Sequence, residues 1–169
     1  CLICDIGTGS GALGISLAHY LPLARVFATD ISPQALDTAR DNATSLQVEV
    51  EFLEGDLLSP FLDKEQCFDL IVANLPYISQ EEYHTLDSGV KSYEPQIALL
   101  APGDGLDIYR RLLPQAFTLL KEGAYLFIEI GWQQGEKALQ MVNDFEEVRL
   151  IKDLAGYDRV VMARKGSVK

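Results

Sequence analysis

Three glycines at alternate positions follow an apolar segment at the start of the chain, and this feature constrains the fold more than any other. Leu2–Ile6 is typical of a buried strand, and the run Asp5–Gly11 (Asp-Ile-Gly-Thr-Gly-Ser-Gly) leads into a helix predicted over residues 11–20. Glycines permit a tight strand-to-helix turn and let a ligand approach the backbone. The sequence therefore predicts an α/β unit with a ligand-binding turn, and a tight turn without a ligand is the alternative.

Strand-like and helix-like segments alternate along the rest of the chain, which favours a parallel sheet covered by helices. Further strands are predicted near residues 25–29, 48–53, 67–73 and 124–130, and further helices near 32–44, 106–120 and 134–143. Pro114 is expected to kink or split its helix. Segments 148–154 and 159–163 predict a hairpin, so the last strand should run antiparallel in a seven-stranded mixed sheet.

Composition and charge exclude several classes of function. The 169-residue chain carries a net charge of −11, and its 14 lysines and arginines form no basic stripe, which disfavours direct nucleic-acid binding. No apolar run is long enough to span a membrane, and no signal peptide is visible. Cys1 and Cys4 point to opposite faces of a strand, so no metal site is expected. We expect a cytoplasmic monomer without membrane contact.

The spacing of the glycines and the acidic residues near them favour S-adenosylmethionine over NAD as the cofactor. The run is G-x-G-x-G rather than the dinucleotide pattern G-x-G-x-x-G, and the ammonium and sulfonium of S-adenosylmethionine favour an acidic neighbour such as Asp5. Asp30 is predicted to accept both ribose hydroxyls and Asp56 the adenine amine, although Asp56 also suits a helix cap. The expected cofactor-binding residues are Asp5, Gly7, Thr8, Gly9, Ser10, Gly11, Asp30, Asp56, Leu57 and Asn74.

Asn74-Leu75-Pro76-Tyr77 closes the fourth predicted strand and is the candidate catalytic segment. The Asn74 amide can face a cleft, Pro76 fixes the backbone, and Tyr77 offers a flat face for stacking. Such a corner suits a planar amide or amine, so we expect Asn74 and Tyr77 to be catalytic and the whole tetrapeptide to bind substrate. A long segment over residues 78–104 shows no periodicity and is predicted to be functional.

Several segments together resemble the release factor glutamine N5-methyltransferases, the HemK-like family. They are Asp5–Gly11, Asn74–Ile78, Val90–Pro95, Glu129–Gly135 and the closing segment Asp153–Arg159. The resemblance covers nearly the whole chain. It implies a Rossmann-like class I fold that uses S-adenosylmethionine, with a catalytic domain over residues 1–164 and the family's N-terminal helical domain absent. Residues 165–169, at the end of the chain, are expected to form a mobile tail.

The resemblance also implies a substrate, the glutamine of a Gly-Gly-Gln motif in a peptide chain release factor. The Asn74 side-chain oxygen and the Leu75 carbonyl would accept hydrogen bonds from the target amide, while Pro76 and Tyr77 would wall it. The family usually has Asn-Pro-Pro-Tyr, so Leu75 is a departure. Asn-Leu-Pro-Tyr also occurs in ribosomal RNA adenine dimethyltransferases. An adenine-N6 methyltransferase acting on RNA or DNA is therefore one alternative. An inactive cofactor-binding fragment and a dehydrogenase are two further alternatives.

Overall fold

The computed structural model describes residues 1–64, 66–78, 100–101 and 103–167. Its strands are β1 (Leu2–Ile6), β2 (Arg25–Asp30), β3 (Glu51–Glu54), β4 (Phe68–Ala73), β5 (Leu120–Glu129), β6 (Glu146–Lys152) and β7 (Asp158–Arg164). Its helices are α1 (Ala12–Tyr20), α2 (Pro33–Leu46), the short 3-10 helix η1 (Ser59–Phe61), α6 (Asp107–Leu119) and α7 (Gly135–Met141). The predicted alternation of strands and helices is confirmed.

The strands form one mixed sheet of seven strands in the order β3-β2-β1-β4-β5-β7-β6. The pairs from β3 to β5 are parallel, and β7 is antiparallel to both β5 and β6. The predicted terminal hairpin is therefore confirmed. The chain builds outward from β1 through β2 to β3 and then returns to the other side of β1 with β4. Ligands in open α/β sheets bind beyond the carboxyl ends of the strands at such a switch point.

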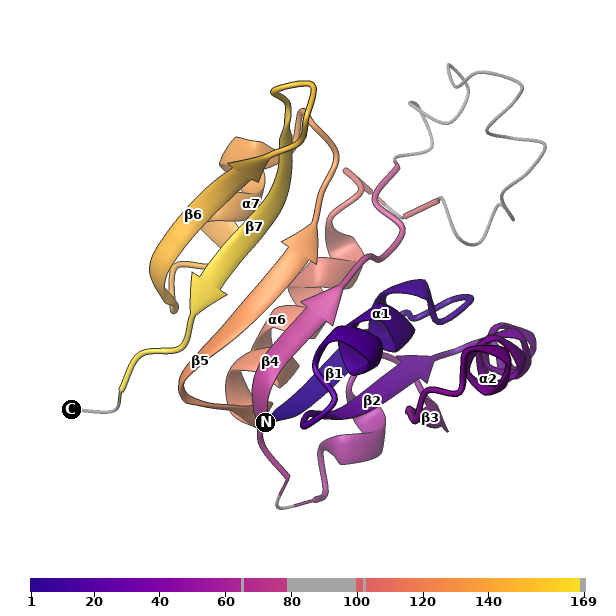
Figure 1. Ribbon diagram of the computed structural model, residues 1–169. Helices are drawn as coiled ribbons and strands as arrows, with labels where there is room; N and C mark the ends of the chain where they lie inside the picture. Colours follow the sequence, from indigo (N-terminus) through magenta and orange to yellow (C-terminus); the bar gives the residue numbers. More distant parts are fainter. Residues whose placement is uncertain (65, 79–99, 102, 168–169) are drawn as a thin grey trace, which may run out of the picture.

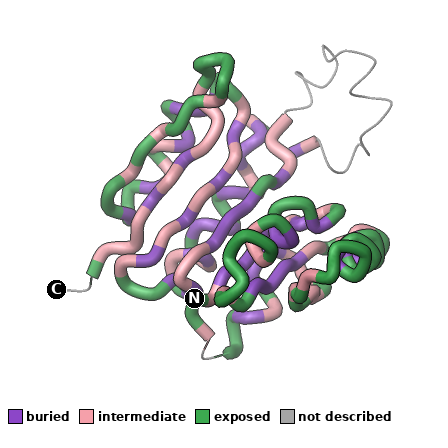
Figure 2. Tube along the Cα trace, viewed as in Figure 1, coloured by how far each residue is buried: buried purple, intermediate pink, exposed green. Residues whose placement is uncertain are grey.

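Helices lie on both faces of the sheet. In Figure 1, α1 and α2 lie in front of the strands β1 and β2, while α6 and α7 lie behind β4, β5 and β7. The buried bands in Figure 2 follow the strands, and the outward faces of the helices are exposed. Alternating burial along β5, where Leu126 and Ile128 are buried against the helices, fixes the register of the central strands.

Three sequence predictions need correction. The fifth strand begins at Leu120 rather than near residue 124. The third strand is shorter than predicted and covers Glu51–Glu54 rather than residues 48–53. Pro114 does not split α6, which is continuous over Asp107–Leu119. Pro114 and Arg110, whose carbonyl loses its helical partner, are both exposed, so water can satisfy that carbonyl.

The long segment predicted over residues 78–104 lies largely outside the described residues. Its two described ends meet, because Ile78 and Leu100 form a parallel bridge and the Ala101 N–H donates to the Ile78 carbonyl at 2.9 Å. Residues 90–95, one of the segments that carry the family resemblance, lie outside the described residues. At the end of the chain, the Lys165 N–H donates to the Ala124 carbonyl at 2.9 Å, so Lys165 is still attached to the sheet.

Candidate active site

The glycine-rich turn and the Asn74–Tyr77 segment meet at the carboxyl ends of β1 and β4. They line a cleft of about 520 Å³ between them. The lining residues are Asp5, Gly7, Thr8, Gly9, Ser10, Ala12, Leu13, Asn74, Leu75, Pro76, Tyr77, Ile78 and Glu129. Two segments far apart in the sequence are thus brought to one site, at the switch point of the sheet.

Gly7 and Gly9 have the conformations that their positions demand. Both have positive φ angles, +67° and +57°. A Cβ on Gly7 would lie 2.4 Å from Cδ2 of Leu75, so the absence of a side chain lets the two segments touch. A Cβ on Gly9 would have no atom within 4 Å and would project into open space. The turn therefore offers an open cradle of backbone beside the cleft.

Asp5 is almost fully buried beneath this turn. Its Oδ2 accepts a hydrogen bond from the Thr8 hydroxyl at 2.6 Å and another from the Gly14 N–H at 2.9 Å. Burial raises the pKa of the Asp5 carboxyl from 3.8 to about 6, and the two hydrogen bonds oppose that rise. Asp5 therefore braces the turn from below while it also lines the cleft.

Asp30 stands at the end of β2, as predicted, and its carboxylate binds the backbone. Its Oδ2 accepts from the Gly9 N–H at 2.8 Å, and its Oδ1 accepts from the Ser32 N–H at 2.9 Å. The side chain is not among the residues that line the cleft. Each oxygen keeps a lone pair, so ribose binding by Asp30 stays a prediction.

Asp56 and Leu57 lie after β3 and outside the cleft, as does Gly11. The Asp56 carboxylate is paired with the Arg111 guanidinium of α6, a partner that the sequence did not indicate. Leu57 is buried, has a φ angle of +56°, and its carbonyl accepts from the Thr29 hydroxyl at 2.9 Å. Contact of Asp56 and Leu57 with adenine stays a prediction, and for Asp56 it requires a shared or broken ion pair.

Asn74 is exposed at the cleft, and the residue after it is anchored from below. The Leu75 N–H donates to the Tyr109 hydroxyl at 3.1 Å, and that hydroxyl donates to the Glu129 carbonyl at 2.5 Å. Tyr109 comes from α6 and is fully buried, and burial raises the pKa of its hydroxyl far above the usual value. This anchor was missed, because nothing in the α6 sequence marks one core tyrosine as different from another.

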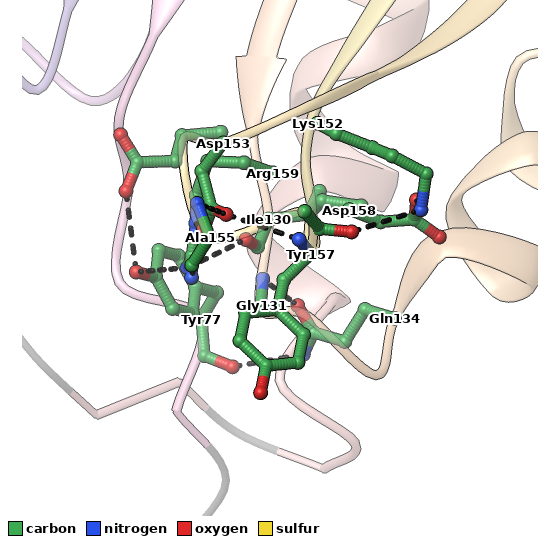
Figure 3. Close-up of polar contacts among 12 residues, drawn as sticks. Tyr77, Ile130, Gly131, Gln134, Lys152, Asp153, Ala155, Tyr157, Asp158 and Arg159 are labelled. Atoms are coloured by element: carbon green, nitrogen blue, oxygen red, sulfur yellow. Dashed lines mark hydrogen bonds and ion pairs between the residues drawn. The ribbon is translucent and has the colours of Figure 1, made fainter.

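Tyr77 is held at both its ring and its backbone. Its hydroxyl donates to Glu129 Oε1 at 3.2 Å and accepts from Arg159 Nη1 at 3.4 Å, while its carbonyl accepts from Gln134 Nε2 at 2.9 Å. Figure 3 shows these contacts with residues of the β6–β7 hairpin around them. Burial and then the Glu129 charge raise the pKa of the Tyr77 hydroxyl, so it remains a neutral donor.

Glu129 was not predicted to line the site. Glu129 is the last residue of β5, just as Asp30 is the last residue of β2 and Asp5 the last but one of β1. An acidic residue at the carboxyl end of a strand is therefore the sequence signal that could have indicated Glu129. Asp5 and Glu129 are the two acidic residues among the described residues that line the cleft, and none of these lining residues is a lysine or an arginine. The cleft therefore favours a cationic or neutral ligand over an anionic one.

Comparisons with known proteins agree with this geometry. A family model described as a methyltransferase domain matches residues 1–164. The chain belongs to this methyltransferase domain family. Its fold is accordingly the Rossmann-like class I methyltransferase fold expected from the resemblance.

The more similar proteins carry a narrower name. The "Release factor glutamine methyltransferase" of Moorella thermoacetica is 46% identical over 166 residues, covering 95% of this chain and 58% of that protein. The protein of the same name from Enterococcus faecalis is 38% identical over 164 residues, with the same two coverages. The expected resemblance is confirmed, and the chain spans about 58% of the length of these relatives.

A solved structure extends the likeness to three dimensions. The "ribosomal protein L11 methylase" of Lactobacillus delbrueckii subsp. bulgaricus is 28% identical with a TM-score of 0.68, covering 97% of this chain and 70% of that one. Within the described part of the chain, no helix has the length and apolar character needed to cross a membrane. The same residues contain no cluster of side chains suited to a metal ion.

Proposed function

We propose that this chain is the catalytic part of an enzyme that transfers a methyl group from S-adenosylmethionine to the glutamine side-chain amide of a peptide chain release factor. The observation that carries the proposal is the cleft in which the glycine-rich turn faces Asn74–Tyr77. The names of the relatives support the substrate. Because the chain spans about 58% of those relatives, the activity is proposed for the whole protein.

The residues at the turn fit a cationic cofactor. The open backbone at Gly9 leaves room for a ligand, and the carboxyl groups of Asp5 and Glu129 can offset the positive charges of an ammonium and a sulfonium. When bound, S-adenosylmethionine supplies a methyl group activated by the sulfonium. We assign its binding to Asp5, Gly7, Thr8, Gly9 and Ser10 at the turn, with Asp30 supporting Gly9 from behind.

The acceptor amide would lie against the tetrapeptide. The Asn74 side-chain oxygen and the Leu75 carbonyl can each accept a hydrogen bond from one N–H of a primary amide. These two hydrogen bonds would orient the nitrogen lone pair towards the methyl group. Pro76 and the braced Tyr77 ring wall the planar amide. An amide nitrogen is a poor nucleophile, so positioning and exclusion of water should supply most of the rate. The transfer would break the sulfonium–methyl bond and form the N–methyl bond, and the nitrogen would lose one proton to solvent, since no side chain is assigned as a base.

We further propose that the protein acts as a cytoplasmic monomer. The three free cysteines are consistent with a reducing compartment. The net charge of −11 favours a protein substrate over direct nucleic-acid binding.

The proposal is tested by offering three acceptors to the full-length enzyme with radiolabelled S-adenosylmethionine. They are an unmodified release factor, an RNA and a DNA that contain unmethylated adenine. Label in the release factor alone is the expected result. Label in either nucleic acid and none in protein would overturn the proposal in favour of the adenine methyltransferase, with which this chain shares Asn-Leu-Pro-Tyr.

A further inference from the structure

Two aromatic side chains are exposed together beside the Tyr77 end of the site. Trp132 follows the end of β5 and is 54% exposed, and Tyr157 lies in the β6–β7 turn and is 52% exposed. Their ring centroids are 5.5 Å apart, so they form one surface, here termed the aromatic patch. Isolated exposed apolar residues are ordinary, but paired aromatic rings beside a site are typical of binding surfaces.

The turn that carries Tyr157 is held in place by hydrogen bonds. Asp153 Oδ1 accepts from the N–H groups of Ala155 and Tyr157 at 2.9 and 3.0 Å. The Asp153 N–H donates to the Tyr157 carbonyl at 2.8 Å. The same turn leaves Leu154 wholly exposed. A surface that is ordered before binding loses little conformational entropy when a partner docks on it.

Arg159 joins this turn to the active site. Its guanidinium is paired with Asp153 at 3.1 Å, and Nη1 donates to the Tyr77 hydroxyl at 3.4 Å and to the Ile130 carbonyl at 3.3 Å. Gly131, directly before Trp132, lies against the Tyr77 ring, because a Cβ there would be 3.4 Å from Cδ2 of Tyr77. Figure 3 shows Gly131, Tyr157 and Arg159 around Tyr77, so the chain segments that carry the aromatic patch adjoin the Tyr77 side of the cleft.

The chemistry around the aromatic patch favours a polypeptide over a nucleic acid. Aromatic rings also stack on bases, but such sites need cations to bind the phosphates. The two cations next to the turn are already engaged, since Arg159 is paired with Asp153 and Lys152 with Asp158. With a net charge of −11, the chain adds no attraction for a phosphate backbone.

We propose that Trp132 and Tyr157 form a docking surface for the polypeptide that flanks the acceptor glutamine. This inference deepens the proposed function and rests on it, because the partner is the methyl-accepting release factor itself. Contacts at the aromatic patch would hold the glutamine side chain at the cleft without touching the reacting atoms. The aromatic patch should therefore set the affinity for the protein substrate and leave the cofactor and the chemical step unaffected.

The test measures methyl transfer to the release factor by full-length enzymes carrying Trp132→Ala or Tyr157→Ala. We expect the KM for the release factor to rise about tenfold in each variant, as for an interface hot spot. We expect kcat and the thermal shift with S-adenosylhomocysteine to stay at the wild-type values, and Trp132→Phe to recover most of the affinity. Leu23→Ala is the matched control, because Leu23 is 96% exposed in the loop between α1 and β2.

An unchanged KM in both alanine variants, with active wild-type enzyme, would overturn the docking surface alone. A fall in kcat at unchanged KM would also overturn it, since it would give Trp132 and Tyr157 a role in the chemical step. No transfer by the wild-type enzyme would refute the proposed function instead. Transfer to a nucleic acid that weakens in both variants would assign the aromatic patch to base stacking.

Discussion

At the scale of single residues, Asn74 is the residue that we propose to orient the acceptor nitrogen. It is exposed at the cleft, while its neighbours Leu75 and Tyr77 are fixed by hydrogen bonds from α6 and β5. We expect Asn74→Ala to lower methyl transfer about a hundredfold or more, because the acceptor nitrogen would no longer be aimed. Cofactor binding should largely remain. Radiolabel transfer and a thermal shift with S-adenosylhomocysteine measure the two effects separately.

Asn143→Ala is the matched control for this variant. Asn143 is an exposed asparagine just after α7 and outside the cleft, so its loss should leave transfer unchanged. Undiminished turnover by Asn74→Ala would remove Asn74 from the mechanism.

Asp5 gives a prediction about pH. Because its pKa is about 6 in the folded chain, a cation bound beside it favours the ionised form and lowers that pKa. Affinity for S-adenosylmethionine should therefore rise up to about tenfold between pH 5 and pH 7 and level off above. Isothermal titration calorimetry of wild type and Asp5→Asn measures this. An equal dependence of the affinity on pH in both proteins would show that Asp5 does not face the cofactor.

The same carboxyl group should also affect stability in the absence of ligand. A folded-state pKa above the unfolded value of 3.8 means that the native state binds the proton more tightly. Asp5 therefore costs no stability below about pH 3.8, and the cost grows as pH rises towards about 6. Asp5→Asn should unfold at a higher urea concentration than wild type at pH 7.5, and this gain should vanish near pH 4. An equal difference in urea midpoint between the variant and wild type at both pH values would show that the pKa of Asp5 is not raised in the folded chain.

At the scale of secondary-structure elements, α6 controls the position of the catalytic segment through Tyr109. Its hydroxyl is the acceptor for the buried Leu75 N–H. Removing that acceptor should cost about 1–3 kcal/mol of unfolding free energy and lower kcat, because a buried donor is left unpaired. Urea unfolding and kcat of Tyr109→Phe measure both effects, with Tyr20→Phe, an exposed tyrosine of α1, as the control.

A double-mutant cycle with Leu75→Pro makes the assignment specific. Proline has no N–H, so Tyr109→Phe should cost clearly less in the Leu75→Pro background than in wild type. Equal costs in the two backgrounds would show that Tyr109 acts through packing alone. In that case the N–H that Leu75 has, and that the proline expected from the family resemblance would lack, would gain nothing from the Tyr109 hydroxyl.

The elements differ in how well the sequence predicts them. The glycine-rich turn, β1, β2, β4 and the terminal hairpin have strong local signals, so their positions were predicted closely. Pro114 misled because the hydrogen bond that it removes lies on the solvent side of α6, which only the tertiary structure reveals. Tyr109, Glu129, Gln134 and Arg159 converge on Tyr77 or Leu75 from distant elements, and local patterns carry no information about that convergence.

At the scale of the whole molecule, the residues that we assign to cofactor binding all lie in the described part of this chain. The 169-residue chain should therefore bind S-adenosylhomocysteine, with a rise in Tm of about 5 °C or more at saturation. Differential scanning fluorimetry measures the shift. A shift with NAD and none with S-adenosylhomocysteine would revive the dehydrogenase alternative.

Gly7→Val is the matched loss-of-binding variant for this measurement. A side chain at Gly7, with φ +67°, would meet Leu75 and separate the turn from the catalytic segment. We expect no shift with either ligand in this variant. A wild-type shift in Gly7→Val would place the cofactor elsewhere.

Methyl transfer to a single amide nitrogen is tested by peptide mass spectrometry of the release factor after incubation with the enzyme and S-adenosylmethionine. We expect a single added methyl group, located by fragmentation on the glutamine side chain of the Gly-Gly-Gln motif and absent when the enzyme carries Asn74→Ala. A methyl group on any other residue, or none on the release factor at all, would contradict it.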